Sequence, residues 1–202
     1  MTLSVVDANL LADTLLVPGR VYGYGLFTGV PSNTGTPECA DANYLRQPAV
    51  FPAASGTNGG VKASSIAADF APMAVAQSIA GEGLWDVPQG TLTTALASGT
   101  AYTTLAVSAL TAAVASGDSL VIGSGATTQT VVASAAAAPG ATSVSVTSFV
   151  ANAAYAIGVT VVDVQPGTAA AVFKIAQPVT SYTAGVGVQV QYASGAITFT
   201  VS

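Results

Sequence analysis

Glu82 and Asp86 are two carboxylates four residues apart. A pair of carboxylates about 5–9 Å apart can cleave a glycosidic bond, one as the acid and the other as the base or nucleophile. A sugar-binding cleft would also need aromatic platforms, and Trp85 is the aromatic residue nearby. On a strand, Trp85 would face away from at least one of the two carboxylates. These residues therefore give only weak support for hydrolase activity.

Arg46 is a cation in a stretch that is otherwise mainly apolar. A guanidinium does not lose its proton in a protein, so a buried Arg46 needs carboxylate or carbonyl partners. Glu38 is the favoured partner because the loop after it must fold back before the strand of Arg46 begins, and Asp86 is the second choice. We expect a structural salt bridge that is bidentate at the guanidinium. The alternatives are a contact with a ligand and an exposed side chain.

Other residues capable of chemistry are few. The sequence has no His and one Cys, Cys39, which excludes Ser-His, Cys-His and His-metal sites and an intramolecular disulfide. A lone Cys is more typical of a small buried hydrophobe than of a nucleophile. Asp118 and Asp163 are isolated, whereas a calcium site needs several oxygen donors at loop spacing. We predict a non-enzymatic protein with no catalytic, metal-binding or cofactor-binding residues and no cofactor.

Charged residues are scarce in this chain. Its 202 residues include four basic and nine acidic side chains, and charged residues make up 6%, against about 25% in ordinary globular domains. The apolar content of 51% argues against intrinsic disorder. The four cations are scattered, which argues against nucleic-acid binding because that needs clusters of Lys and Arg. The sequence has no run of about 18 apolar residues, so we expect no membrane insertion.

Hydrophobic periodicity predicts a mainly β protein, with a β-sandwich or barrel-like domain and a short N-terminal helix. The helix is expected to begin at a Ser4 cap and to end at Pro18-Gly19. Alternation predicts strands at 21–27, 44–51 (with Pro48 marking an edge or a bulge), 83–86 and 172–175. Residues 186–192 and 196–201 alternate on either side of Ser194-Gly195, which predicts a C-terminal β-hairpin.

Residues 91–164 form a block of different composition, rich in Ala, Ser, Thr and Val. Residues 103–110 align with 142–149 at an offset of 39, and Gly117 aligns with Gly158 at an offset of 41. A two-residue slip in the loop between these segments explains the change of offset. Two copies predict a small domain of pseudo-twofold character built from two interlocked β-hairpin units, with compositional bias as the alternative explanation. We predict a discontinuous β-domain, 1–90 plus 165–202, that carries 91–164 as an inserted β-domain.

Motifs outside the inserted block resemble a known family. They are Leu26-Phe27-Thr28-Gly29-Val30-Pro31-Ser32-Asn33-Thr34-Gly35, Glu38, Tyr44-Leu45-Arg46-Gln47-Pro48-Ala49-Val50-Phe51, Leu84-Trp85-Asp86, Gly185 and Gly195-Ala196-Ile197. Together they resemble small virion structural proteins of tailed bacteriophages, particularly those of actinobacteria. The chain departs from the family pattern at Ser32, where Gly is usual, and at 39–43, where the family is often Gly-rich. The inserted block resembles the Ala/Thr/Val-rich β modules of phage head and tail surface proteins.

The resemblance implies a virion structural protein on the particle exterior, either a capsid decoration (minor capsid) protein or a tail-associated component of the tail-fibre or minor tail type. A chain so poor in charge is expected to have more apolar surface than its own core covers. Its expected partners are therefore itself, as a homo-oligomer with a trimer favoured, and other virion proteins. The expected location is the virion. The alternative function is a host-surface or glycan-binding adhesin module of the virion, which would expose clustered aromatic residues or a charged cleft.

Overall fold

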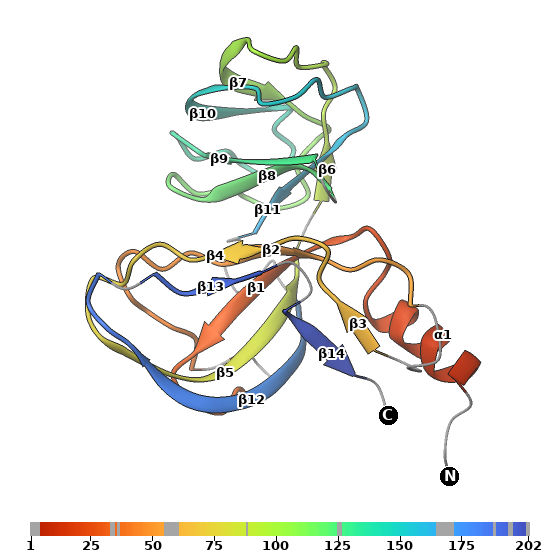
Figure 1. Cartoon of the computed structure of the whole chain (residues 1–202). Coiled ribbons are helices and arrows are strands. Elements are labelled where there is room, and N and C mark those ends of the chain that lie inside the picture. The colour runs from red at the N-terminus through yellow and green to blue at the C-terminus, as the bar shows by residue number, and fades with distance from the viewer. Residues whose placement is uncertain are drawn as a thin grey trace. The chain divides into compact units, whose positions relative to one another are not determined.

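The computed structural model describes residues 5–32, 35, 37–54, 61–87, 89–124, 127–164, 172–187, 189–193 and 196–200. Within these ranges the protein is mainly β, with one short N-terminal helix and several antiparallel sheets (Figure 1), which confirms the fold class predicted from periodicity. The elements are α1 (Val5–Leu15), β1 (Val21–Phe27), β2 (Gln47–Val50), β3 (Val61–Ala63), β4 (Ala68–Asp69), β5 (Gln77–Asp86), β6 (Gln89–Thr91), β7 (Ala101–Ala106), β8 (Ser119–Ser124), β9 (Thr127–Val132), β10 (Ser143–Val150), β11 (Thr160–Asp163), β12 (Val172–Ala184), β13 (Gln191–Tyr192) and β14 (Thr198–Thr200). The predicted Ser4 cap lies outside the described residues.

The chain divides into two compact units. Unit 1 consists of Met1–Leu84 and Lys174–Ser202, and unit 2 consists of Trp85–Phe173. The boundaries given by composition, 91 and 164, fall inside unit 2. Each unit is built around a hydrophobic core of its own.

The main sheet of unit 1 has the strand order β12-β5-β1-β2. Every residue of β1 is buried, and β1 is an inner strand of this sheet with neighbours on both sides. β1 pairs antiparallel with β2, with Val21 opposite Val50 and Tyr24 opposite Gln47. β2 lies at the edge of the sheet, where Pro48 is tolerated because no further strand requires its missing N–H.

The strand predicted at 44–51 is shorter in the structure. Residues 41–44 form a turn, in which Tyr44 N–H donates to Asp41 O at 3.0 Å, and β2 begins only at Gln47. Arg46 therefore precedes the strand instead of lying in its middle. Tyr44 and Arg46 are nevertheless both buried and Leu45 is partly exposed, so the alternation of side chains already holds at these positions.

The predicted C-terminal hairpin is wrong. β13 pairs with β4, with Tyr192 opposite Ala68, and β14 pairs with β3, with Phe199 opposite Lys62. The two short strands thus complete two separate two-stranded sheets. Alternation specifies which face of a strand is buried, but it does not specify the neighbouring strand, and here both neighbours come from much earlier in the chain.

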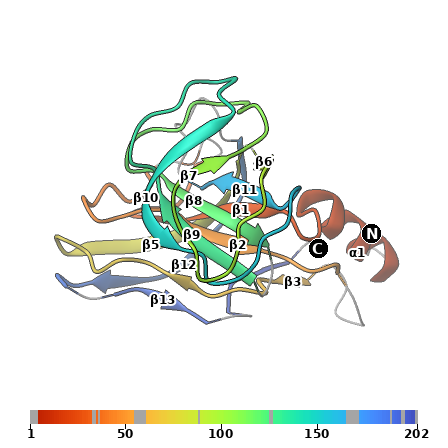
Figure 2. The same cartoon turned by 90° about the horizontal axis from the view of Figure 1, so that it is seen from above.

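The strand β3 lies beside α1 in both views (Figures 1 and 2). The buried amine of Lys62, a residue of β3, binds the C-terminal part of α1 and the residue after it. Lys62 Nζ donates at 2.6 Å to Asp13 Oδ1 and at 2.6 Å to Leu16 O. The Ala54 N–H donates to Asp13 Oδ1 at 2.8 Å. Burial alone would raise the pKa of Asp13, but the hydrogen bonds from Lys62 and Ala54 outweigh burial and lower the pKa. The ammonium also lies at the carbonyl end of the helix, where a cation is favoured.

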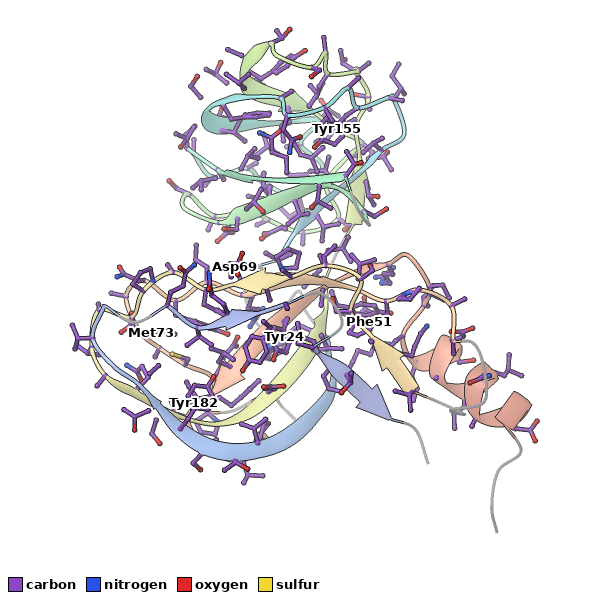
Figure 3. All side chains as sticks on the ribbon, in the orientation of Figure 1. Tyr24, Phe51, Asp69, Met73, Tyr155 and Tyr182 are labelled. Carbon is purple, nitrogen blue, oxygen red and sulfur yellow. The ribbon has the colours of Figure 1, made fainter. Side chains whose placement is uncertain are left out.

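Aromatic rings fill the core of unit 1. Phe70 stacks on Tyr44, with ring centroids 5.7 Å apart. Tyr24 lies between the strands (Figure 3) and packs against Phe70 and Tyr192. Burying a side chain of this size stabilises the fold by about 1.5–3 kcal/mol. These rings come from segments far apart in the sequence, so the core holds β1, the loop before β2 and β13 together.

Unit 2 combines a two-stranded sheet, β10-β7, with a four-stranded sheet, β6-β11-β8-β9. Isolated bridges link the two sheets, Leu92 with Val107 beside β6 and Ala133 with Val146 beside β9. The same strand pairing occurs twice in unit 2. Residues 130–132 of β9 lie 41 positions after residues 89–91 of β6, and residues 119–121 of β8 lie 41 positions before residues 160–162 of β11. The β8–β9 pairs of these residues therefore match the β11–β6 pairs. This register is the pseudo-twofold symmetry that the alignment predicts.

Four turns of related sequence connect the strands of unit 2: 92–100, 110–118, 133–141 and 151–159. Each has Ala at its fourth and sixth positions and Gly at its eighth. The four glycines, Gly99, Gly117, Gly140 and Gly158, have φ values of 76°, 95°, 85° and 88°, a conformation that other residues rarely adopt. A local backbone requirement therefore explains why this Gly recurs.

The turns also correct one detail of the sequence alignment. They make Leu110 equivalent to Ala151, whereas the alignment paired Leu110 with Phe149. The change of offset from 39 to 41 therefore falls before Leu110 and not after it. It coincides with an irregularity in β10, where the register with β7 shifts between Ser145 and Phe149.

Deletion of residues 91–164, with the gap closed by a short Gly/Ser turn, should leave unit 1 folded. Unit 1 has its own aromatic core, and closing a loop of changed length alters the free energy of folding only slowly with length. Far-UV circular dichroism should retain a β spectrum, and thermal unfolding should remain cooperative. A random-coil spectrum for the deletion protein would contradict the two-unit organisation.

Candidate functional site

A bidentate bridge between Arg46 and Glu38 forms the centre of the candidate site. Arg46 Nε donates to Glu38 Oε1 and Arg46 Nη2 donates to Glu38 Oε2, both at 2.8 Å. The side chains are 4% and 17% exposed, so solvent screens the pair only weakly. Charge-assisted hydrogen bonds in this geometry are among the strongest side-chain contacts. Glu38 is the partner that the sequence predicts first for Arg46, and the structure brings these two residues together.

The end of β1 positions Glu38. Phe27, the last residue of β1, forms an isolated bridge with Glu38. The next residue, Cys39, donates its N–H to Leu26 O at 2.8 Å. These backbone contacts hold the loop against β1, so the Glu38 side chain is fixed before the chain turns back toward Arg46.

Tyr44 and Gly25 complete the surroundings of the carboxylate. The Tyr44 hydroxyl donates to Glu38 Oε1 at 2.8 Å and accepts from Leu26 N–H at 3.0 Å. Burial is the main cause that raises the pKa of Tyr44, and the Glu38 carboxylate adds to the effect. A Cβ atom at Gly25 would lie 2.7 Å from Glu38 Oε1. Any larger residue at position 25 would therefore push the carboxylate away from Arg46.

Asp86, the second partner suggested for Arg46, is half-buried at the C-terminal end of β5. Glu82 is a buried residue of the same strand. Residues four apart on a strand are separated by about 13 Å along it. Their side chains would have to lean toward each other by several ångström to reach the roughly 5–9 Å between the carboxyl groups of glycosidases.

Glu82 instead belongs to a partly buried cluster of tyrosines. The Tyr192 hydroxyl donates to Glu82 Oε1 at 2.8 Å, and the Tyr182 and Tyr192 hydroxyl oxygens are 3.0 Å apart. Because Tyr192 gives its proton to Glu82, Tyr182 is the donor in the contact between the two hydroxyls. Burial raises the pKa of Tyr192 and of Tyr24, and the Glu82 carboxylate contributes to both shifts. Hydrogen bonds of this cluster join β5, β12 and β13, and the Tyr24 ring of β1 packs against Tyr192.

Asp41 holds a second loop, which the sequence analysis did not anticipate. Its Oδ1 accepts from Ala74 N–H and Asn43 N–H, and its Oδ2 accepts from Val75 N–H, all at 2.9 Å. These backbone donors, that of Ala74 first, lower the pKa of Asp41. The Asp41-Ala42-Asn43 sequence is typical of a turn in which Asp binds the N–H two residues on. That signal was available in the sequence, whereas the partners at 74 and 75 were not.

The other candidate residues lie apart from one another. Cys39 is a free thiol in the core of unit 1, where burial raises its pKa. In unit 2, Asp118 accepts from the Ala115 N–H, and Asp163 is buried in β11. In the described part of the chain, no three His, Cys, Asp or Glu side chains come together in a group that would hold a metal ion. No helix within the described ranges has the length and apolar character needed to cross a membrane.

Unit 2 has a surface groove of about 340 Å³. The end of the β8–β9 hairpin forms one wall, with Ser124 and Thr127, and the turn 151–159 with Thr160 forms the other. The turn is held by amide contacts: Asn152 N–H donates to Gln129 Oε1 at 3.0 Å, and Tyr155 donates its hydroxyl proton to Asn152 Oδ1. The lining is therefore neutral and rich in hydroxyl groups. Tyr155, labelled in Figure 3, is too deeply buried to offer a ring face to a ligand.

Comparison of the chain with known protein families, curated proteins and solved structures finds no match.

Replacing one partner of the Arg46–Glu38 bridge should destabilise unit 1 strongly. Arg46→Met and Glu38→Gln should each lower the free energy of unfolding by about 3–5 kcal/mol, because the remaining charged group loses its partner in a buried site. The double variant should lose less than the sum, which denaturant unfolding of all four proteins measures. Additive losses, or single losses under about 1 kcal/mol, would mean that the pair behaves as an exposed one.

Asp41→Asn should destabilise the protein at neutral pH and much less in acid. The folded protein lowers the pKa of Asp41, so the stabilisation is present above the pKa of the unfolded chain, about 3.9, and disappears as the pH falls through the folded-state value. Urea unfolding at a series of pH values should show the two proteins converging at low pH. Asp69→Asn, which removes an exposed carboxylate from β4, is the control for the loss of one charge. A stability difference for Asp41→Asn that does not change with pH would contradict the role given to the carboxylate.

Proposed function

We propose that this chain is a non-enzymatic structural protein on the exterior of a bacteriophage particle, as a capsid decoration protein or a tail-associated component. The motifs of unit 1 that resemble small virion structural proteins support the proposal. The structural observation that carries it is an uncovered apolar surface on α1 and the residues after it. In this proposal the protein acts by assembling, with itself and with other virion proteins.

The apolar surface of α1 is formed by Leu10, Leu11, Leu15 and Val17, which are 67%, 40%, 40% and 48% exposed. Ala8, Ala12 and Leu16 bury one side of the helix; Leu11 and Leu15 lie at the border of that side, and Leu10 faces away from it. Contiguous exposed apolar side chains on a folded protein mark interaction sites. Because Lys62 and Asp13 hold the helix in place, this surface is presented in a fixed orientation on unit 1.

Unit 2 offers a contact surface of a different kind. In residues 89–164 the charged side chains are Asp118 and Asp163. The exposed side chains of β10 are mostly hydroxyls, those of Ser143, Ser145, Thr147 and Ser148. A surface of this composition makes short-range polar and van der Waals contacts with little long-range electrostatic attraction or repulsion. It suits a spacer or contact domain on a particle built from many copies.

The second candidate function is an adhesin that binds a host-surface glycan. The observation that favours it is the neutral groove of unit 2, lined by Ser124, Thr127 and Thr160. Hydroxyl and backbone groups can bind the hydroxyls of a sugar, although a stacking ring is the more usual anchor. Binding of neutral oligosaccharides by the intact protein, lost on replacing Thr127 and Thr160 with Val, would favour this function over assembly alone.

The purified protein should be a homo-oligomer, with a trimer favoured, or should bind purified phage particles. Leu11→Gln together with Leu15→Gln should abolish either behaviour, because burying two amides in place of two leucines disfavours an apolar contact. Val186→Gln is the matched control, since Val186 is 68% exposed in a turn outside α1. Light scattering and co-sedimentation with particles measure the result.

A wild-type protein that is a clean monomer and fails to bind particles would contradict the proposed function. Unchanged assembly of the Leu11/Leu15 variant would overturn the role of α1 in it. Imaging of the particle distinguishes the two locations, because a decoration protein adds density to the shell and a tail component adds it to the tail.

A further inference from the structure

We infer that each half of unit 2 carries an interaction surface that fits a second copy of the same half, so that unit 2 is a homodimer joined into one chain. The first half is 89–121 and the second half is 130–162. The inference rests on the pairing of strands and turns between the halves and goes beyond the proposed function. The partner that each half fits is a copy of itself.

The outer strands of unit 2 pair in the same register in both halves. Each β11–β6 pair corresponds to a β8–β9 pair after a shift of 41 residues. The matching pairs are Ser119–Val132 with Thr160–Thr91, Leu120–Val131 with Val161–Gly90, and Val121–Thr130 with Val162–Gln89. The last strand of each half thus pairs with the first strand of the other half.

The central strands meet their own equivalents. Val121 of β8 is opposite Val162 of β11, which is its equivalent at an offset of 41. Leu105 of β7 is opposite Val144 of β10, its equivalent at an offset of 39. In a twofold contact, a residue on the axis faces its own copy. These two pairs therefore mark where the pseudo-twofold axis passes through unit 2.

The turns exchange backbone hydrogen bonds in the same reciprocal way. Gly99 N–H donates to Ala151 O, and its equivalent Gly140 N–H donates to Leu110 O, the equivalent of Ala151. Likewise Gly117 N–H donates to Ala133 O, and Gly158 N–H donates to Leu92 O. In these four hydrogen bonds each contact from the first half to the second is matched by the equivalent contact from the second half to the first, which is the pattern of an isologous dimer interface.

Side-chain volumes are also compatible with the pairing of one half of unit 2 with a second copy of itself. Where the turns cross, Leu96 is opposite Tyr155 and Val114 is opposite Ala137. One crossing therefore pairs two large side chains and the other pairs two small ones. Two copies of the first half would place Leu96 opposite Val114 at both crossings, which is intermediate in volume. Cores tolerate apolar replacements that keep the total volume and pattern.

The test is a full-length chain in which residues 130–162 are replaced by the sequence of 89–121. The variant should fold, and unit 2 should then contain two identical halves. In a ¹H–¹⁵N correlation spectrum, equivalent amides of the two halves should coincide, so unit 2 should give about half as many resolved signals as in the wild type. The reciprocal variant, with 89–121 replaced by the sequence of 130–162, should behave in the same way.

A register control separates symmetry from composition. Replacing 130–162 with the sequence of 90–122 keeps the composition almost unchanged but shifts every strand by one residue, which turns its buried side chains outward. This control should give random-coil signals for unit 2. If both in-register variants unfold like the control, or if either folds with two distinct sets of signals for equivalent residues, the inference is wrong.

Discussion

A buried cation must be matched by an acceptor, and unit 1 is organised around two of them. The chain has four basic residues, and two of these, Arg46 and Lys62, are buried. Arg46 is matched by Glu38 at the end of β1, and Lys62 by Asp13 and the carbonyl of Leu16. In each case the cation joins segments that the hydrophobic core alone would leave free to shift: the loop before β2 in one, the N-terminal helix in the other. Removing an acceptor would leave a desolvated charge, which is far more costly than losing an exposed contact.

Sequence pattern identified Arg46 because a lone cation in an apolar stretch is a local signal. The same reasoning could not find the full partnership of Asp41 or the contact between Glu82 and Tyr192. In both, the partner lies on a segment that only the folded chain brings near. The C-terminal strands show the same limit: alternation marked residues 196–201 as β structure, but the choice between a hairpin and pairing with β3 depends on tertiary packing.

More of the structure of unit 2 than of unit 1 could be predicted from the sequence, because the two halves of unit 2 are similar in sequence to each other. The recurring Gly of the four turns reflects a left-handed backbone conformation, and the alternating Val and Leu residues reflect one buried face. Both are local requirements of the backbone or of one strand face, so the Gly and the alternating apolar residues can be recognised in the sequence even where the other positions differ. The position of the change in offset was misjudged because an irregularity within a strand, unlike one in a loop, has no signature of Gly, Pro or Asn.

The pairing of β6 with β11 has a consequence for how this chain can change over time. These are the first and last strands that lie wholly within unit 2, and Gln89 is opposite Val162, so the two ends of its set of strands lie side by side, about 4.8 Å apart. A unit with adjacent ends can be accepted by any surface turn of a host fold without pulling the host's strands apart. Gain, loss or replacement of the whole unit then needs no compensating change in the host core. Unit 2 can therefore be gained, lost or replaced in one step while the fold of unit 1 stays the same.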